Sequence, residues 1–335
     1  MDSVILELSD FGDQQLALDP NFSKLRDKMR KSLKQAFSMN FDLVYTFKKS
    51  SANKLHSPSD VKISYNNDCI VVGNRGDCNI IFFNYTTKLY MTSFKPAKLF
   101  YCFLIENGEY QDNDYFIIND EYSTMSKYHL ATLIDHCKNG TNCDTLWENN
   151  TLSSPYGMTI RREKNKKTND VAENWIYVSN CGTNSIVVVK AATGTKVMDI
   201  KFGQPTLSQP YGIEFIVGDS MLIVSEYNNR RCSILKQDEN GDWQVDKTIQ
   251  TGHITGEDFD CPLGIAYDKI GRRIFVCDQY KSAIRILNEQ GQIIGAYKGG
   301  SGNISMGRPF GITFDERKGE LYVTHFSANE VRIYR

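Results

Sequence analysis

Histidines and cysteines are the residues of this 335-residue chain best suited to metal binding, proton transfer or nucleophilic chemistry. The five histidines are His56, His129, His136, His253 and His325. They are scattered along the sequence, so a metal site would need a fold that brings distant segments together. No convincing Ser-His-Asp order, phosphate-binding glycine loop or dinucleotide fingerprint accompanies them. The candidate chemistry is therefore a metal centre whose existence depends on the fold.

The nine cysteines do not form a disulfide framework in the sequence pattern. Most lie inside apolar, strand-like runs, such as Cys69, Cys102, Cys232 and Cys277. Cys137 and Cys143 flank the sequence KNGTN and would be able to pair or bind a metal, but no further ligand has zinc-type spacing. The chain begins MDSVILELSDFGDQQ, which lacks the basic region and apolar stretch of a signal peptide. We therefore expect reduced thiols, a cytoplasmic location and no membrane span.

A repeat of roughly 40 to 60 residues is the strongest pattern in the sequence. Each unit has short apolar runs rich in Val, Ile, Phe and Tyr, separated by turn residues, which indicates a four-stranded antiparallel meander. The units open with a proline at Pro58, Pro96, Pro155, Pro210, Pro262 and Pro309. In four units a glycine stands two residues later, at Gly157, Gly212, Gly264 and Gly311. We expect these glycines to permit close backbone approach near a central axis.

A polar residue follows the second apolar run of every unit. These residues are Asn74, Asp120, Asn180, Glu226, Asp278 and His325. A third apolar run follows at constant spacing in five units, whereas the second unit, around YSTMSKYHLATLI, departs from the register. We expect the polar side chains to hydrogen-bond the backbone of the following turn, and a ring of ligands in a central channel is the alternative.

The repeat predicts an all-β fold, a six-bladed β-propeller with four-stranded antiparallel blades over residues 41–335. The sixth unit ends within its third strand, at Val331–Arg335, so its fourth strand is missing. The segment DLVYTFK, residues 42–48, precedes the first unit and resembles a fourth strand. We therefore expect this N-terminal strand to complete the last blade and close the ring, which removes the exposed sheet edges.

Residues 1–40 form a separate N-terminal segment. Asp19 and Pro20 are typical of a helix start, and a short amphipathic helix is predicted over about residues 20–38. Its apolar stripe consists of Phe22, Leu25, Met29, Leu33 and Phe37, and its other faces are basic. We expect the helix to pack against the propeller, while binding to a partner or a membrane surface is the alternative.

The register of these motifs resembles a known family. The pattern Pro-x-Gly-Ile, then (Ile/Leu)-(Phe/Tyr)-Val-x-(Asp/Asn/His), then (Ile/Val)-Arg-(Ile/Leu), is similar to the NHL repeat over about residues 42–335. The resemblance implies a propeller whose lead-in loops, which precede the first strands, share one face with the loops joining second to third strands. We call this surface the loop face.

The resemblance also implies where a metal would bind, because some NHL-like and lactonase-type propellers hold zinc or another divalent ion at the channel mouth. His56 and His325 belong to loop-face segments of neighbouring blades, and His253 lies near the same face. These three histidines are the candidate ligands. We nevertheless expect no cofactor, because they occupy non-equivalent positions in the repeat.

Aromatic and basic residues are frequent on the expected loop face, as in protein-binding hot spots. The candidate binding residues are Arg75, Tyr122, Tyr156, Tyr211, Tyr227, Arg230, Tyr280, Lys281, Phe310 and Phe326. We expect a non-catalytic scaffold that binds a protein or peptide partner. A metal-dependent hydrolase or lyase at the channel mouth is the alternative, so enzymatic activity stays open. Single-stranded RNA comes third, because the charges of the loop face nearly cancel and the acidic run GEDFD interrupts it.

Overall fold

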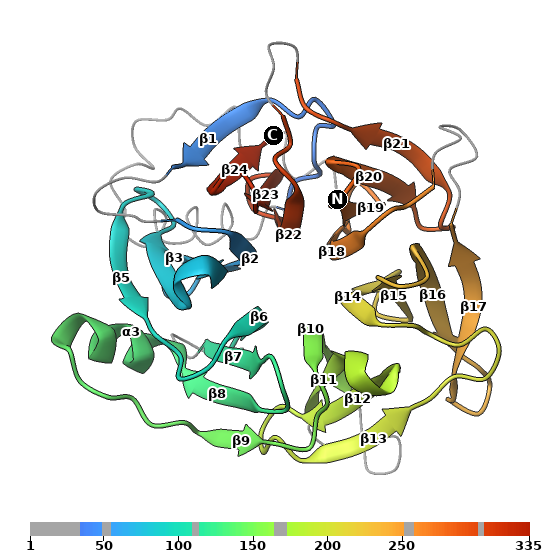
Figure 1. Ribbon diagram of the computed structural model, residues 1–335, viewed down its shortest axis with the longest axis horizontal. Helices are drawn as coiled ribbons and strands as arrows, with labels where there is room; N and C mark the ends of the chain where they lie inside the picture. Colours follow the sequence, from blue (N-terminus) through green and yellow to red (C-terminus); the bar gives the residue numbers. More distant parts are fainter. Residues whose placement is uncertain (1–33, 49–54, 109–113, 164–172, 251–257, 301–304) are drawn as a thin grey trace, which may run out of the picture.

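Six four-stranded antiparallel sheets stand around a central axis like the blades of a propeller (Figure 1). The structure is a computed structural model that describes residues 34–48, 55–108, 114–163, 173–250, 258–300 and 305–335. The prediction of a six-bladed, mainly β propeller is confirmed. Within the described residues no helix has the length and apolar character needed to cross a membrane.

In five blades the strands follow chain order from the axis outward. Blade 1 contains β2 (Pro58–Ser64), β3 (Cys69–Asn74), β4 (Asn79–Asn84) and β5 (Tyr90–Phe94), and blade 2 contains β6 (Phe100–Glu106), β7 (Tyr115–Asp120), β8 (Met125–His129) and β9 (Trp147–Asn149). Blade 3 contains β10 (Pro155–Glu163), β11 (Glu173–Asn180), β12 (Ser185–Lys190) and β13 (Lys196–Ile200). Blade 4 contains β14 (Pro210–Ile216), β15 (Met221–Glu226), β16 (Arg231–Gln237) and β17 (Trp243–Ile249), and blade 5 contains β18 (Pro262–Asp268), β19 (Arg273–Asp278), β20 (Ala283–Asn288) and β21 (Ile293–Tyr297).

Blade 6 combines strands from both ends of the described chain. It contains β22 (Pro309–Asp315), β23 (Glu320–His325), β24 (Glu330–Tyr334) and, at its outer edge, β1 (Leu43–Phe47) (Figure 1). β1 runs antiparallel to β24, with Leu43 opposite Tyr334 and Phe47 opposite Val331. The backbones of Asp42 and Arg335 exchange two hydrogen bonds of 2.9 Å, which extend the ladder by one pair.

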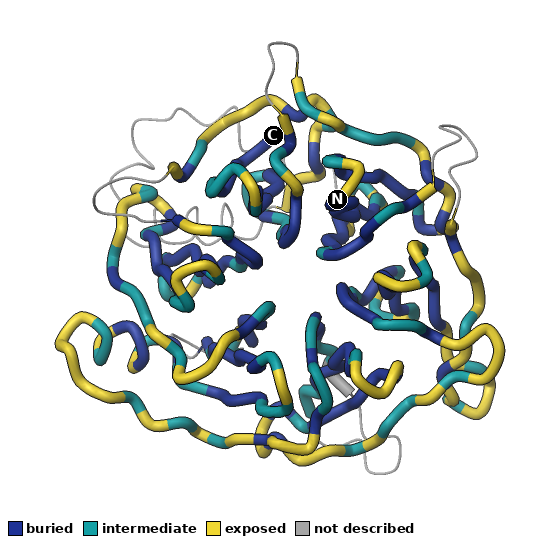
Figure 2. The backbone as a smooth tube through the Cα atoms, viewed as in Figure 1, coloured by how far each residue is buried: buried dark blue, intermediate teal, exposed yellow. Residues whose placement is uncertain are grey.

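Within the described residues, six hydrophobic clusters fill the spaces between neighbouring blades, one for each pair. Between blades 5 and 6, for example, Phe275 and Ile284 pack against Leu321 and Val323. Figure 2 shows the result, with buried backbone in the inner and middle strands and exposed backbone along the outer strands. Each blade is therefore covered on both faces by its neighbours.

The glycines of the Pro-x-Gly motifs lie where neighbouring inner strands approach one another most closely. A Cβ atom on Gly212 would lie 2.1 Å from the carbonyl oxygen of Leu263 in the next blade, and one on Gly264 would lie 2.5 Å from that of Phe310. These positions therefore exclude side chains, as the sequence predicts. In blades 1 and 2 the same place is taken by Asp60 and Cys102, so two side chains reach the channel there.

Blade 2 departs from the repeat in two ways. Its inner strand begins at Phe100, which pairs with Asp120 as the prolines of the other blades pair with their polar residues, so the prediction that Pro96 opens this unit is wrong. The outer part of the blade contains helix α3 (Leu130–Asn139), inserted between β8 and β9. This insertion explains why the sequence here loses the register. Short 3-10 turns, η2 (Arg75–Asp77) and η3 (Cys181–Thr183), follow the second strands of blades 1 and 3.

The predicted helix over residues 20–38 lies mostly outside the described residues. Its last part is wrong, because residues 34–38 have no helical structure. Their backbone bonds to the propeller instead, with Gln35 N–H donating to the carbonyl oxygen of Glu316 and Phe37 N–H donating to Asp268. The rings of Phe37 and Phe41 are buried in the cluster between blades 5 and 6. Residues 34–42 are therefore part of the propeller's packing.

Candidate functional site

The recurrent polar residue is the last residue of the second strand in every blade. All six residues, Asn74, Asp120, Asn180, Glu226, Asp278 and His325, are buried. None of them is among the residues that line the central cavity. The structure therefore does not support a ring of ligands in the channel.

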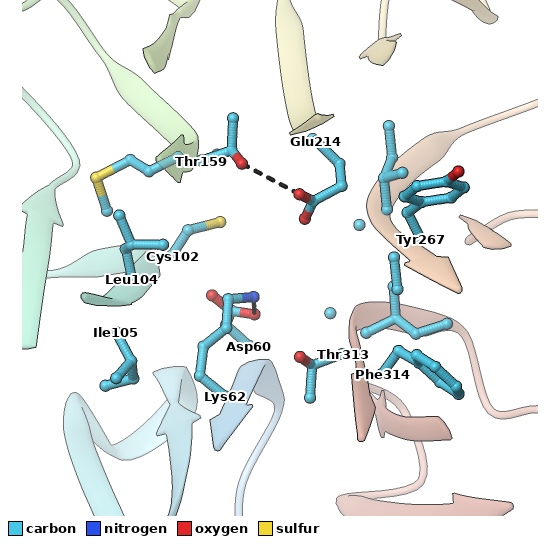
Figure 3. Close-up of a pocket in the computed structure, with 18 of the residues that line it drawn as sticks. Asp60, Lys62, Cys102, Leu104, Ile105, Thr159, Glu214, Tyr267, Thr313 and Phe314 are labelled. Atoms are coloured by element: carbon cyan, nitrogen blue, oxygen red, sulfur yellow. Dashed lines mark hydrogen bonds and ion pairs between the residues drawn. The ribbon is translucent and has the colours of Figure 1, made fainter. Parts of the chain in front are cut away.

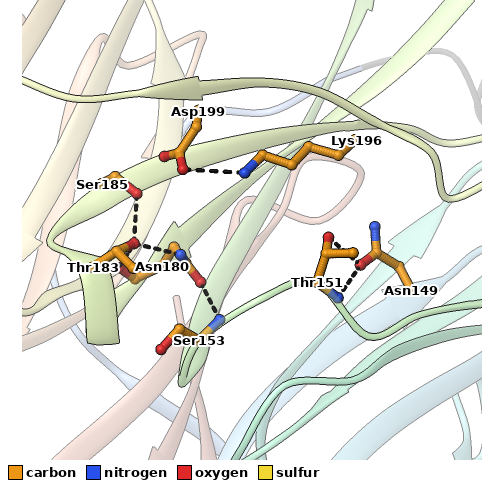
Figure 4. A network of polar contacts seen from close by, with 8 residues as sticks. All are labelled: Asn149, Thr151, Ser153, Asn180, Thr183, Ser185, Lys196 and Asp199. Atoms are coloured by element: carbon orange, nitrogen blue, oxygen red, sulfur yellow. Dashed lines mark hydrogen bonds and ion pairs between the residues drawn. The ribbon is translucent and has the colours of Figure 1, made fainter.

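The side chain of Asn180 shows what this position does (Figure 4). Its Oδ1 accepts a 2.7 Å hydrogen bond from the backbone N–H of Ser153 in the lead-in loop, and its Nδ2 donates to Thr183. The oxygens of Asn74, Glu226 and Asp278 likewise accept backbone N–H groups of their own lead-in loops. The sequence predicted a bond to the backbone of the following turn, and Asp120 makes it, because its Oδ1 accepts the backbone N–H groups of Tyr122, Ser123 and Thr124. The usual partner is the preceding loop, which the polar residue fastens to its blade.

Two of these carboxylates are also paired with arginines. Asp278 and Arg285 are both fully buried, and Arg285 Nε donates to Asp278 Oδ2 at 3.1 Å. Glu226 accepts from Arg231 Nε at 2.8 Å. Both carboxylates also accept a hydrogen bond from a backbone N–H group of a lead-in loop. The ion pairs therefore connect the second and third strands to the loop face.

The candidate metal ligands are not brought together by the described residues. His325 is buried in blade 6, where Nδ1 contacts the carbonyl oxygen of Met306 and Nε2 lies 3.1 Å from Tyr334 Oη. His56 is exposed and lies 3.2 Å from a carboxylate oxygen of Asp77. His253 lies outside the described residues. No group of three His, Cys, Asp or Glu side chains with metal-binding geometry occurs in the described part of the chain.

Stability should increase with pH in the range where His325 would otherwise be protonated. Burial lowers the pKa of His325 from 6.5 to about 3. The unfolded state therefore binds a proton below pH 6.5 that the folded state does not bind, and stability is lost as pH falls from 6.5 toward 3. We expect the free energy of unfolding, measured in urea, to be about 2 kcal/mol lower at about pH 5 than at about pH 7.

The variant His325→Gln should lose most of this pH dependence, because glutamine retains a donor for Met306 but does not titrate in this range. His56→Gln is the matched control, since His56 is exposed. Equal pH dependence in the wild type and His325→Gln would show that His325 is not the group responsible.

Aromatic side chains close the channel at the loop face. Tyr101, Tyr156, Tyr211 and Phe310 are the second residues of their inner strands and form one cluster with Leu263. The ring centroids of Tyr156 and Tyr211 are 4.2 Å apart, and those of Tyr211 and Phe310 are 5.8 Å apart, although Tyr211 and Phe310 come from blades that are not neighbours. We call these five residues the plug. Three predicted binding residues, Tyr156, Tyr211 and Phe310, are therefore packed across the axis.

Other predicted binding residues remain exposed around the plug. Tyr280 is 52% exposed, and its hydroxyl lies 3.3 Å from that of Tyr227 in the neighbouring blade. Arg308 lies over the ring of Tyr280 at 5.8 Å, and Arg230 pairs with Asp260 at 3.4 Å. We call Tyr227, Arg230, Tyr280 and Arg308 the rim.

The remaining predicted residues lie at different places on the same face. Tyr122 of blade 2 is 64% exposed, and Lys281 is exposed beside Tyr280. Arg75 is directed inward, where it stacks on Tyr101 of the plug at 4.1 Å and donates to its hydroxyl. Phe326 stacks on Phe310. The predicted set therefore divides into the plug with its supports and an exposed part.

A cavity of about 440 Å³ occupies the channel below the plug. The inner strands of all six blades line it, and it extends to the loops that follow these strands, where the exposed side chains of Lys34 and Lys269 stand. The cavity is therefore a well that is closed at the loop face and reaches the opposite face. A volume of this size is within the range of small-molecule sites.

Two charged groups face each other across this well (Figure 3). Lys62 of blade 1 pairs with Asp60 at 2.8 Å, and Asp60 also accepts the backbone N–H groups of Val61 and Phe103. Glu214 projects from blade 4, on the opposite side of the ring, and its Oε1 accepts from Thr159 Oγ1 at 3.1 Å. Neither Lys62 nor Glu214 was predicted from the sequence to be a site residue.

The surroundings of the cavity shift the pKa values of Lys62 and Glu214. Burial lowers the pKa of Lys62, but the charge of Asp60 and its hydrogen bond outweigh this effect, so the pKa is raised above 10.5 and the ammonium is retained. Burial raises the pKa of Glu214, and the more distant Lys62 offsets this only in part. Burial also raises the pKa of the Cys102 thiol well above its usual value, which makes it a poor nucleophile.

Comparison with known proteins identifies the fold. No protein-family model and no curated protein matches the sequence. Among solved structures, a protein of unknown function from Bacteroides thetaiotaomicron is similar over 90% of this chain and 74% of its own, with a TM-score of 0.60 and 16% identity. The β-propeller domain of Myceliophteria thermophila Cps50 (Swd1) is similar over 88% of this chain and 98% of its own, with a TM-score of 0.57 and 8% identity. A streptogramin B lyase is similar over 87% of this chain and 97% of its own, with a TM-score of 0.55 and 13% identity. Similarity at this level concerns the fold alone.

Proposed function

We propose that this protein is a non-catalytic scaffold that binds a protein or peptide partner on its loop face. The observation that supports this most directly is the exposed rim around a closed channel end. Tyr227 and Tyr280 present large aromatic surfaces beside the guanidinium groups of Arg230 and Arg308. Tyrosine and arginine are the residue types enriched in protein-binding hot spots.

The plug favours this function over a catalytic site at the same channel mouth. Its packed rings occupy the axis at this end of the channel. The metal-dependent hydrolase or lyase is less well supported, because His325 is buried with contacts at both ring nitrogens. RNA binding also has less support, because the acidic residues near the rim, such as Asp260, oppose a polyanion.

The assignment to the NHL-repeat family and to the cytoplasm belongs to the same proposal. The close approach at Gly157, Gly212, Gly264 and Gly311 gives the Pro-x-Gly motif a structural reason. The nine cysteines are free thiols, in keeping with a reducing compartment. We also propose that the protein depends on its N-terminal strand to hold the ring closed.

Selection from a random peptide library displayed on phage tests whether the loop face binds peptides. Peptides enriched on the wild-type protein are synthesised, and their affinities for the wild type and for the double variant Tyr227→Ala/Tyr280→Ala are measured by calorimetry. We expect the double variant to bind about ten- to a hundredfold more weakly, as the loss of hot-spot aromatics implies. Tyr90→Ala is the matched control, because Tyr90 is exposed on the outer strand of blade 1.

Three outcomes would contradict the proposal. The first is that enriched peptides bind the double variant as tightly as the wild type. The second is stoichiometric zinc or calcium in the purified protein that is lost in a His56 or His325 variant, which would favour the metal-dependent enzyme. The third is retention on mixed-sequence RNA at physiological salt.

A further inference from the structure

The cavity below the plug has a charge arrangement that the repeat does not require. The channel-facing residues at the fifth position of the inner strands are Lys62, Leu104, Thr159, Glu214, Ala266 and Thr313. The two charged members belong to blades 1 and 4, which stand opposite each other in a six-bladed ring. A cation and an anion therefore face each other from opposite walls.

Lys62 and Glu214 do not neutralise each other directly. The ammonium of Lys62 makes its ion pair with Asp60, which lies on the same strand. Of its three N–H donors, the contact with Asp60 occupies one, and the Lys62 side chain lines the cavity. The ammonium thus retains hydrogen-bonding capacity toward the interior of the well.

Glu214 supplies the negative charge on the wall opposite Lys62. Both of its described hydrogen bonds, from Thr159 Oγ1 and from the Phe215 N–H, go to Oε1. The carboxylate lies at the cavity wall and is directed into it (Figure 3). Since burial raises its pKa, a cationic partner would stabilise the ionised form.

The rest of the wall limits the kind of molecule that fits. Apolar side chains, including those of Leu104, Met158 and Ala266, stand between the charged groups. The cavity is therefore suited to a compact molecule with two opposite charges and an aliphatic part, because polar groups fixed beside apolar side chains orient such a ligand.

We propose that this well binds a small zwitterion of the amino-acid class, with its ammonium group on Glu214 and its carboxylate on Lys62. Thr159 supplies a further hydroxyl acceptor beside Glu214. The ligand enters from the face opposite the rim, where Lys34 and Lys269 stand. This site is separate from the partner-binding surface, and neither proposal depends on the other.

Calorimetric titration of the full chain with glycine, alanine, valine and leucine tests the proposal. We expect saturable one-to-one binding of at least one of these amino acids. The methyl ester of that amino acid lacks the carboxylate and its N-acetyl derivative lacks the ammonium, so each should bind about ten- to a hundredfold more weakly. This comparison uses the wild-type protein and does not depend on the folding of a variant.

Two variants test which side chain binds the ammonium group of the ligand and which binds its carboxylate. Glu214→Gln keeps an acceptor for Thr159 but cannot pair with an ammonium, and Lys62→Met removes the partner of the ligand carboxylate. Each should weaken binding about ten- to a hundredfold. The matched controls Glu148→Gln and Lys236→Met change residues of blades 2 and 4 that do not line the cavity, and should bind normally.

The proposal is overturned if none of the four amino acids binds saturably. It is also overturned if the ester or the N-acetyl derivative binds as tightly as its parent, or if glucose, a neutral polyol, binds while the amino acids do not. Unchanged affinity in both Glu214→Gln and Lys62→Met would place the binding site elsewhere and overturn it as well.

Discussion

A chain that begins after Lys48 is expected to unfold or aggregate at temperatures where the full chain is folded and monomeric. The deletion removes β1, which leaves the outer edge of β24 without its partner. It also removes Phe37, Phe41 and Phe47, which are 2%, 6% and 3% exposed. Burial of one such ring contributes about 1.5–3 kcal/mol, so the loss is comparable with the stability of a typical domain, about 5–15 kcal/mol. Thermal unfolding followed by circular dichroism, together with gel filtration, measures the effect.

A chain that begins at Asp19 is the matched control for this deletion. It keeps residues 34–48 and every contact described for them, including the stacking of Phe41 on Tyr297. We expect its melting temperature to equal that of the full chain. If the protein lacking residues 1–48 stayed monomeric with an unchanged melting temperature, the ring would not depend on this strand.

The propeller architecture could be predicted from the sequence because the repeated prolines and glycines reflect the geometry of the backbone. A proline begins the inner strand in five blades, and a glycine stands at the closest approach in four; both reflect local constraints on the backbone. Blade 2 was placed less well, since Phe100 replaces the proline and α3 interrupts the strand pattern. In blade 2 the packing against the neighbouring blade determines the fold, and the sequence of a single repeat does not reveal such contacts between blades.

Side-chain roles were harder to predict, because they depend on which blades meet. Tyr211 and Phe310 were predicted to be binding residues of the loop face, but their rings meet across the axis. The charged residues Lys62 and Glu214 are four residues after the opening prolines Pro58 and Pro210. That spacing marks them as channel-facing once the inner strands are known, and charged residues there stand out from Leu, Thr and Ala in the other blades. The sequence signal existed, but only the closed ring places these two residues opposite each other.

Replacement of Asp278 by alanine should lower the free energy of unfolding by about 3–5 kcal/mol. The substitution removes the carboxylate that lies 3.1 Å from the fully buried guanidinium of Arg285, and removal of one member of a buried ion pair typically costs about this much. It also leaves the backbone N–H groups of Asp260 and Cys261 without the acceptor that holds the lead-in loop of blade 5. Urea denaturation monitored by fluorescence measures the change.

Asp278→Asn separates the two contributions, because the amide oxygen retains an acceptor for the lead-in loop while the negative charge is lost. We expect it to be less destabilising than Asp278→Ala but still less stable than the wild type, since the buried Arg285 loses its ion pair with Asp278. Asp246→Ala is the matched control: its ion pair with Lys236 is 3.1 Å long but about half exposed, so the loss should be at most about 1 kcal/mol. A similar small loss for Asp278→Ala would mean that neither its ion pair with Arg285 nor its hydrogen bonds to the lead-in loop contribute much to stability.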